Sequence, residues 1–171
     1  MKTFDVIALG ELNVDLILNR IAGFPEVGKE IFARDMICTL GSSTAIFAAN
    51  VSALGARTAF AGMIGRDAFG ELVRGSLEAR GVDTRYVIEA ADRATGVTVV
   101  MSYGEDRANV TYPGAMEALR FADLDPEIFL SARHIHLSSL FMQPGLLADI
   151  VPILRAAHDG GATVSLDTQW D

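Results

Sequence analysis

Residues 38–55 read CTLGSSTAIFAANVSALG, and the rest of the chain is organised around this stretch. It begins with a short loop that contains Gly41. Either Ser42 or Ser43 can cap the helix that follows, because a serine oxygen accepts an unpaired amide hydrogen of the first turn. Gly55 suits the left-handed residue that ends many helices. The predicted buried face carries large apolar residues at helical spacing: Phe47, Val51 and Leu54.

The loop has two interpretations when it is taken alone. Small residues at a helix N-terminus expose amide donors, which suits a hydroxyl-rich or anionic ligand. The simpler interpretation is a plain loop before a core helix. The neighbouring segments decide between them.

The composition describes an acidic chain with enough apolar residues for a core. It has 171 residues, 50% of them hydrophobic, which suits one globular domain. The formal net charge of −8 argues against a nucleic-acid partner, since Lys and Arg supply most affinity for phosphates. Cys38 is the only cysteine, so no internal disulfide can form and a reducing compartment is expected. We expect a cytoplasmic protein, because no signal peptide and no apolar run long enough to span a membrane occurs.

Strand-like and helix-like segments alternate along much of the chain. Asp67 can cap a helix that ends before Gly81, and a further helix is predicted around residues 146–154, with a kink at Pro152. Short apolar runs predict buried strands at residues 6–9, 58–65, 135–139 and 163–167. This alternation is typical of an α/β fold with a parallel sheet. No helix covers the last strand, so we expect that a partner covers it or that the chain is a piece of a longer protein.

Two further segments break this alternation. Apolar and polar residues alternate over residues 11–18, which puts Asn13 and Asp15 on one face of a strand. This strand lies just past the end of a core strand, where open α/β sheets bind ligands, although a solvated strand face gives the same pattern. Residues 95–102 and 109–112 flank a polar turn and predict a β-hairpin. We expect the hairpin to form a small separate sheet, together with the strand that carries Asn13.

Several common kinds of site are not supported. His134 and His136 have strand spacing, but no further ligand type lies nearby at ligand spacing, so we predict no metal site. The chain has no Gly-x-Ser-x-Gly elbow, Walker loop or Gly-x-Gly-x-x-Gly motif, which argues against a serine hydrolase, a P-loop enzyme and a dinucleotide-binding protein. We interpret Arg107 as an exposed loop charge, and three methionines as core filling: Met101, Met116 and Met142.

The order of short motifs resembles the PfkB-type, ribokinase-like carbohydrate kinases over nearly the whole chain. The motifs are Gly10-x-x-Asn13-x-Asp15, Pro25-x-x-Gly28, the glycine-serine loop with its helix ending Leu54-Gly55-Ala56, Gly62-x-x-Gly65-x-Asp67-x-x-Gly70, Gly81-Val82-Asp83-Thr84, Thr95-Gly96 and Pro113-Gly114-Ala115. Each motif alone is weak evidence for this resemblance, whereas the order and spacing of the motifs are specific to the family.

The resemblance implies an ATP-dependent kinase that phosphorylates a hydroxyl of a sugar or related molecule. It implies a three-layer α/β sandwich with a mostly parallel sheet and a small β-sheet lid. Residues 1–171 would be the N-terminal part, with lid strands around 12–20 and 95–112. It also implies a homodimer that pairs through the lid sheet. The implied substrate-binding residues are Asn13, Asp15, Gly28, Gly41, Ser42, Ser43, Ile46, Val97 and Ser139.

The chain departs from the family pattern in its loop. Ser42 stands where the family usually has a second glycine, and Ile46 stands where it usually has an asparagine. Since isoleucine cannot hydrogen-bond a hydroxyl, the substrate is expected to be less hydroxylated or differently placed there. An already phosphorylated substrate would need a cation in the pocket, and the candidates are Lys29, Arg93 and Arg107.

The family's Asp-Thr-x-Gly-Ala-Gly-Asp motif, which carries the catalytic base, does not occur in the 171 residues. Asp167 and Asp171 match the end of a middle strand rather than this base. ATP and Mg²⁺ are therefore expected for the full-length enzyme and not for residues of this chain, which alone should be inactive. The alternatives are a nucleoside kinase of the same fold and a short non-catalytic module for sugar binding or dimerisation.

Overall fold

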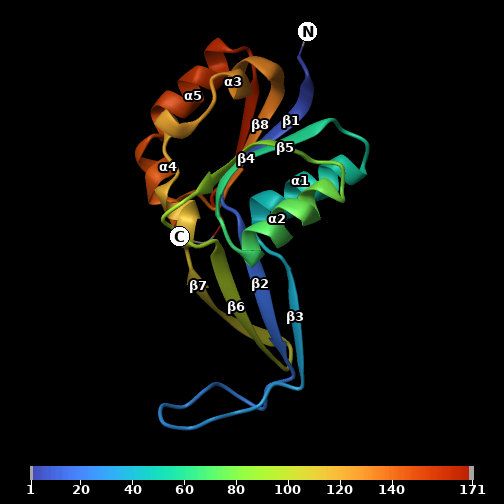
Figure 1. Ribbon diagram of the computed structural model, residues 1–171, viewed down its shortest axis with the longest axis vertical. Coiled ribbons are helices and arrows are strands. Elements are labelled where there is room, and N and C mark those ends of the chain that lie inside the picture. The colour runs from blue at the N-terminus through green and yellow to red at the C-terminus, as the bar shows by residue number, and fades with distance from the viewer. Residues whose placement is uncertain (1, 170–171) are drawn as a thin grey trace.

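The computed structural model describes residues 2–169, which form two β-sheets flanked by helices (Figure 1). The main sheet has five strands in the order β5-β4-β1-β8-β9, and all neighbours are parallel. Its strands are β1 (Phe4–Leu9), β4 (Thr58–Gly65), β5 (Asp83–Ala90), β8 (Ala132–Ser138) and β9 (Thr163–Asp167). The parallel pairing confirms the predicted α/β fold class.

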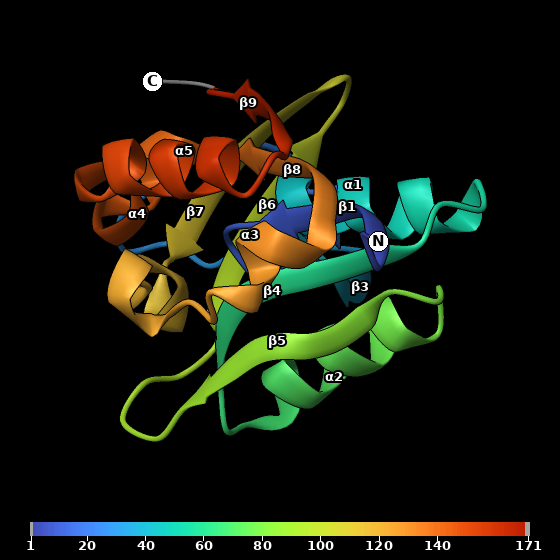
Figure 2. The same ribbon diagram turned by 90° about the horizontal axis from the view of Figure 1, so that it is seen from above.

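Helices cover both faces of the main sheet (Figure 2). One face carries α1 (Ser43–Ala53) and α2 (Ala68–Glu78), and the other carries α3 (Glu127–Ser131), α4 (Pro144–Ala148) and α5 (Ile150–Asp159). Each face has its own hydrophobic core, because alternate side chains of β1 point to opposite faces: Ile7 and Leu9 to one, Ala8 to the other. Three short 3₁₀ segments connect these elements at Gly114–Ala118, Phe121–Asp123 and Leu140–Met142.

The lid is a separate four-stranded sheet in the order β3-β2-β6-β7. It consists of β2 (Asn13–Asn19), β3 (Asp35–Leu40), β6 (Gly96–Tyr103) and β7 (Asp106–Tyr112). As predicted, β6 and β7 form a hairpin outside the main sheet, and β2 pairs with β6. The lid projects from the end of the main sheet at which β1 stops (Figure 1).

The helix at the centre of the opening stretch begins as predicted, but its most buried residues are small ones that were not predicted to face the core. Ser42 is its N-cap, with Oγ accepting the Ala45 N–H at 2.9 Å, and Gly55 has a φ of 96° after its end. The predicted face is confirmed in part: Phe47 packs against the core and Val51 is half-buried, whereas Leu54 is 89% exposed. The buried residues of the helix are its small ones: Thr44, Ala45, Ala48 and Ala49. Their size lets the helix lie close to the sheet.

The structure also contains elements that the sequence analysis does not predict, and it corrects one predicted helix. The unpredicted elements are strands β3 and β5. The single kinked helix around Pro152 is also wrong, since α4 and α5 are separate helices that meet at Asp149. Pro152 lies in the first turn of α5, where N–H groups have no hydrogen-bond partner within the helix, so the missing N–H of proline costs no hydrogen bond.

Asp171 lies outside the described residues. No helix of residues 2–169 is long and apolar enough to cross a membrane.

Asp67 ties the lid to the main sheet as well as capping α2. Its Oδ1 accepts the Gly70 N–H at 2.8 Å, and its Oδ2 accepts the Thr95 N–H, also at 2.8 Å, at the entry to β6. Burial acts to raise the pKa of Asp67, but these amide hydrogen bonds outweigh it and lower the pKa below its ordinary value.

We expect Asp67→Ala to lower the free energy of unfolding of the full-length protein by about 1–3 kcal/mol at pH 7, because a cap and a buried amide lose their acceptor. Because the folded pKa is depressed, this stabilisation is present above the unfolded pKa of about 3.9 and is lost as the pH falls through the folded pKa. Denaturant unfolding at pH 7 and pH 3 measures both effects. Asp67→Asn should be intermediate, and equal stability of Asp67→Ala and wild type at pH 7 would refute this role.

Candidate functional site

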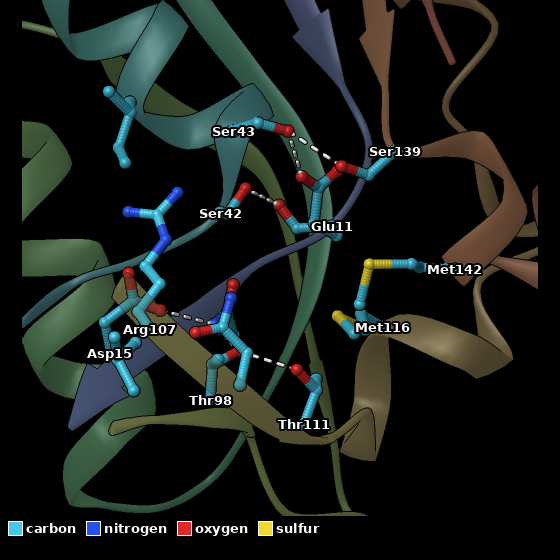
Figure 3. A pocket seen from close by; sticks show the side chains of 14 residues that line it. Glu11, Asp15, Ser42, Ser43, Thr98, Arg107, Thr111, Met116, Ser139 and Met142 are labelled. Carbon is cyan, nitrogen blue, oxygen red and sulfur yellow. Dashed lines mark hydrogen bonds between the residues drawn. The ribbon is translucent and has the colours of Figure 1, made fainter. Parts of the chain in front are cut away.

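A cavity of about 320 Å³ lies between the lid and the ends of the main-sheet strands (Figure 3). Lid residues such as Asp15 and Thr98 lie across it from Ser43 and Ser139, which belong to the main-sheet side. Its lining residues are Glu11, Asn13, Asp15, Ser42, Ser43, Ile46, Thr98, Val100, Arg107, Asn109, Thr111, Met116, Ser139 and Met142. The cavity therefore combines a polar floor with a few apolar and sulfur-containing side chains.

The strand alternation of β2 brings Asn13 and Asp15 together at this cavity. Asn13 Nδ2 donates to Asp15 Oδ1 at 3.1 Å and to Thr98 Oγ1 at 2.9 Å. Since the carboxylate and the Val14 carbonyl are obligatory acceptors for Asn13, the amide nitrogen must face them and Oδ1 must face away. Within residues 2–169 no donor reaches Asn13 Oδ1, so this oxygen and the Asp15 carboxylate are both available as acceptors.

Gly41 allows these two side chains to reach their positions. A Cβ atom at Gly41 would lie 2.7 Å from Asp15 Cγ and 2.8 Å from Asn13 Nδ2, both closer than real Cβ contacts. Its N–H also donates to the Asn13 carbonyl at 3.0 Å. Glycine is needed here because the backbone itself forms the wall behind Asp15.

The protonation of Asp15 depends on opposing effects. Burial is the largest and raises its pKa, whereas the hydrogen bond from Asn13 and the positive charge of Arg107 lower it. The net result is a pKa above the ordinary value. Asp15 therefore takes up a proton at a higher pH than an exposed aspartate does.

This shift predicts the pH dependence of substrate binding. Protonation removes the charge of the carboxylate and turns one of its acceptor oxygens into a donor, so we expect the KM of the full-length enzyme for its acceptor to rise as the pH falls, with a midpoint above about 3.9. Arg107→Met should move this midpoint upward, because it removes a charge that favours the carboxylate. The pH profile of KM measures both, and a midpoint at or below 3.9 would contradict the assignment.

The opposite side of the cavity is built around a residue that the sequence interpretation missed. Glu11 is 3% exposed and accepts hydrogen bonds from the Ser43 hydroxyl at 2.8 Å and from the Thr44 hydroxyl at 2.5 Å. Ser43 Oγ also lies 2.8 Å from Ser139 Oγ. An acidic residue directly after a buried strand was the available signal, because such a position points toward the end of the sheet where ligands bind.

The lid supplies further residues that were missed or misinterpreted. Arg107 is exposed as predicted, but it lies on β7 rather than in a loop and lines the cavity, which corrects that part of its interpretation. Met142 also lines the cavity and is 43% exposed, which corrects its interpretation as core filling, whereas Met116 lines the cavity and is buried. The missed lid residues are Thr98, Val100, Asn109 and Thr111.

The structure does not bring every predicted residue to the cavity. Six of them line it: Asn13, Asp15, Ser42, Ser43, Ile46 and Ser139. Gly41 supports it from behind, as described above. Gly28 lies in an exposed loop with a φ of 80°, and Val97 pairs with Val14 and packs against the core beneath the lid. These two positions are outside the cavity.

His134 and His136 bind neighbouring hydroxyls in the structure. Both lie 2.7 Å from Ser165 Oγ through a ring nitrogen, and His136 stacks on Phe47 with ring centroids 3.8 Å apart. Burial lowers the pKa of both histidines. Among residues 2–169 no group of three or more His, Cys, Asp and Glu side chains is placed to hold a metal ion.

In a comparison with family models, residues 3–171 match the pfkB family of carbohydrate kinases. This chain belongs to that family. Among curated PfkB-family relatives, it is 35% identical over 133 residues to a probable fructokinase-3 of Arabidopsis thaliana, covering 74% of this chain and 38% of the relative. It is 29% identical over 136 residues to a nucleoside kinase of Methanothermobacter thermautotrophicus, covering 79% of this chain and 44% of the relative.

Solved structures agree on the fold. An Escherichia coli protein provisionally assigned as ribokinase II, solved with ATP and Mg²⁺, superposes with a TM-score of 0.83 at 24% identity. The superposition covers 98% of this chain and 54% of that one. The PfkB-type fold of this chain is thus confirmed, and the chain spans about half the length of this relative and less than half of the two curated ones.

Proposed function

We propose that the full-length protein transfers a phosphoryl group from ATP to a hydroxyl of a sugar or sugar-like compound. In this proposal, residues 1–171 supply the substrate-binding part and the lid, and have no kinase activity alone. The observation that carries it is the pair of acceptors, Asn13 Oδ1 and the Asp15 carboxylate, that face one cavity in a PfkB-family chain.

The chemistry of this pair fits a polyhydroxylated ligand. A carboxylate that accepts from hydroxyls forms charge-assisted hydrogen bonds, worth about 1.5–3 kcal/mol each. Asp15 and Asn13 would hold the substrate against the lid, while Ile46 and Met142 would contact its less polar parts. The lid would exclude water from the site, so that the phosphoryl group is transferred to the substrate hydroxyl and not to a water molecule.

ATP and Mg²⁺ would supply the phosphoryl group and neutralise its charge when bound. Among residues 2–169 no group of three or more His, Cys, Asp and Glu side chains could hold a metal ion, and in this proposal the chain binds and orients the acceptor. The catalytic base and the ATP site would lie in the remainder of the protein. We also propose that the enzyme acts in the cytoplasm, where ATP is available.

A nucleoside kinase of the same fold is the second candidate. It is supported by the 29% identity to the Methanothermobacter nucleoside kinase. The apolar Ile46, 43% exposed at the cavity, also favours a ligand with an apolar part such as a base. A third candidate, a non-catalytic binding module, would retain the cavity without transferring phosphate.

A substrate panel on the full-length protein separates these candidates. ATP consumption with Mg²⁺ is measured against fructose, ribose, hexose monophosphates, sugar acids and nucleosides. Sugar phosphorylation with lower activity on nucleosides supports the main proposal, and the reverse supports the nucleoside kinase. Binding of a sugar without ATP consumption would show that the protein is a binding module.

We further propose that the lid forms a homodimer through its outer face. The residues of β7 that alternate with the cavity-lining ones are apolar and exposed: Val110 is 61% and Tyr112 is 56% exposed. On β3, Met36 pairs with Leu18 and extends the same face, at 65% exposure. A sedimentation measurement on the full-length protein tests this, and a monomer at micromolar concentration would contradict it.

A further inference from the structure

The buried carboxylate of Glu11 is held in one orientation by obligatory donors. Its Oε1 accepts the Thr44 N–H at 3.2 Å, and its Oε2 accepts Gln143 Nε2 at 3.1 Å. The Gln143 amide is itself oriented, because Nε2 also lies 2.9 Å from the Ser138 carbonyl oxygen, which can only accept. The N-terminus of α1 adds a favourable dipole. Each carboxylate oxygen therefore meets the surrounding groups as an acceptor.

This orientation fixes the direction of the neighbouring hydroxyl hydrogen bonds. A serine hydroxyl has one hydrogen to donate and two lone pairs to accept with. The hydroxyl of Ser43 lies 2.8 Å from Glu11 Oε1 and must use its hydrogen there. It then has no hydrogen for Ser139 Oγ at 2.8 Å, so that bond must run from Ser139 to Ser43.

Ser138 does not reverse this direction. Its Oγ lies 2.7 Å from Ser43 Oγ and 2.9 Å from Thr44 Oγ1. Thr44 also donates its only hydroxyl hydrogen to Glu11, so Ser138 is the donor toward whichever of these two oxygens it bonds. Every hydroxyl in the cluster is thus polarised toward Glu11.

Ser139 is the end of this chain of hydrogen bonds and lines the cavity. We propose that Glu11 is a positioning residue that acts through Ser43 to make Ser139 Oγ a hydrogen-bond acceptor toward the substrate. The hydrogen of Ser139 is used within the protein, and its lone pairs face the ligand. This inference rests on the proposed function and adds a third acceptor to Asn13 Oδ1 and Asp15.

The consequence is a specific requirement on the substrate. All three polar groups on the floor accept, so the bound molecule must present hydroxyl hydrogens to each of them. Fluorine replaces a hydroxyl with similar size but cannot donate. Loss of one hydrogen bond of about 1.4 kcal/mol corresponds to a tenfold change in affinity.

Monofluorinated analogues of the preferred sugar, one for each hydroxyl except the one that is phosphorylated, test this in the full-length enzyme. One analogue should lose its bond to Ser139. In wild type, we expect the KM for this analogue to be about tenfold higher than the KM for the parent sugar. In Ser139→Ala, the parent and this analogue should have equal KM values. Ser131→Ala is the matched control, because Ser131 is buried with an unpartnered hydroxyl outside the cavity lining, and it should keep the wild-type ratio.

Glu11→Gln tests the polarising role. With its amide nitrogen in the place of Oε1, the new side chain donates to Ser43 Oγ and frees the Ser43 hydrogen to turn toward Ser139, so the tenfold ratio should fall toward one. A purely structural role for Glu11 would change KM for parent and analogue equally and leave the ratio at tenfold, which would overturn the proposal. Equal KM values for all analogues in wild type would overturn it too.

A neutron structure of the full-length protein decides the hydrogen directions without a substrate or a variant. The proposal predicts deuterium between Ser43 and Glu11, and deuterium on Ser139 directed at Ser43. Deuterium on Ser43 directed at Ser139 would overturn it. A protein that phosphorylates no sugar would instead contradict the proposed function. The neutron map would still show the direction of the hydrogen bond between Ser43 and Ser139.

Discussion

Asp15→Ala in the full-length enzyme is expected to raise the KM for the sugar tenfold or more. The substitution removes a charged acceptor whose bonds to hydroxyls contribute about 1.5–3 kcal/mol each. It also leaves Asn13 Nδ2 without one of its acceptors, so the orientation of that amide is less defined. Steady-state kinetics at saturating ATP measures the effect.

Two further variants show that the effect belongs to the cavity. Asp15→Asn keeps one acceptor oxygen without the charge, and its KM should lie between those of wild type and Asp15→Ala. Asp92→Ala removes an exposed carboxylate in the loop before the lid hairpin, outside the cavity lining, and should leave KM unchanged. A KM for Asp15→Ala equal to that of wild type would contradict the role of Asp15 in substrate binding.

Gly41→Ala is expected to raise KM about a hundredfold or more, because one methyl group displaces two binding side chains. The added Cβ would meet the Asp15 carboxylate and would lie 2.8 Å from Asn13 Nδ2. Two hydrogen bonds lost from the substrate, about 2.7 kcal/mol, correspond to that factor. The fold should persist, because the crowded atoms face the cavity rather than the core.

Gly75→Ala provides the matched control for this substitution. Gly75 lies within α2, and a Cβ there would meet no atom within 4 Å. Alanine at a helical position should stabilise the protein by about 0.5–1 kcal/mol and leave KM unchanged. Kinetics and thermal unfolding on both variants separate binding from folding. A wild-type KM for Gly41→Ala would show that Asp15 and Asn13 do not bind the sugar.

The core strands could be predicted from sequence because burial leaves a simple pattern. Strand β1 contains the apolar run at residues 6–9, and every residue of β4 is buried. Strand β3 was missed because its first four residues are exposed, so neither a run nor an alternation marks it. The buried face of α1 was only partly predicted: Phe47 packs against the core, but the fully buried positions are the alanines Ala45, Ala48 and Ala49, which a search for large apolar residues passes over.

The cavity was only partly predictable for a different physical reason. Asn13 and Asp15 lie two residues apart on one strand, so strand geometry alone places them together. Glu11 and Gln143 are 132 positions apart and meet only because β1 and β8 are neighbours in the sheet. Such a contact depends on the strand order, which local patterns do not specify. Arg107 was misinterpreted because the hairpin turn is shorter than expected and places it on β7.

A crystal structure of the full-length protein with its preferred sugar would show whether Asp15 and Asn13 bind the substrate. We expect the sugar in the cavity between the lid and the main sheet, with hydroxyl oxygens within about 3 Å of Asp15 and of Asn13 Oδ1. A sugar bound elsewhere, or a cavity that instead holds the phosphates of ATP, would contradict it.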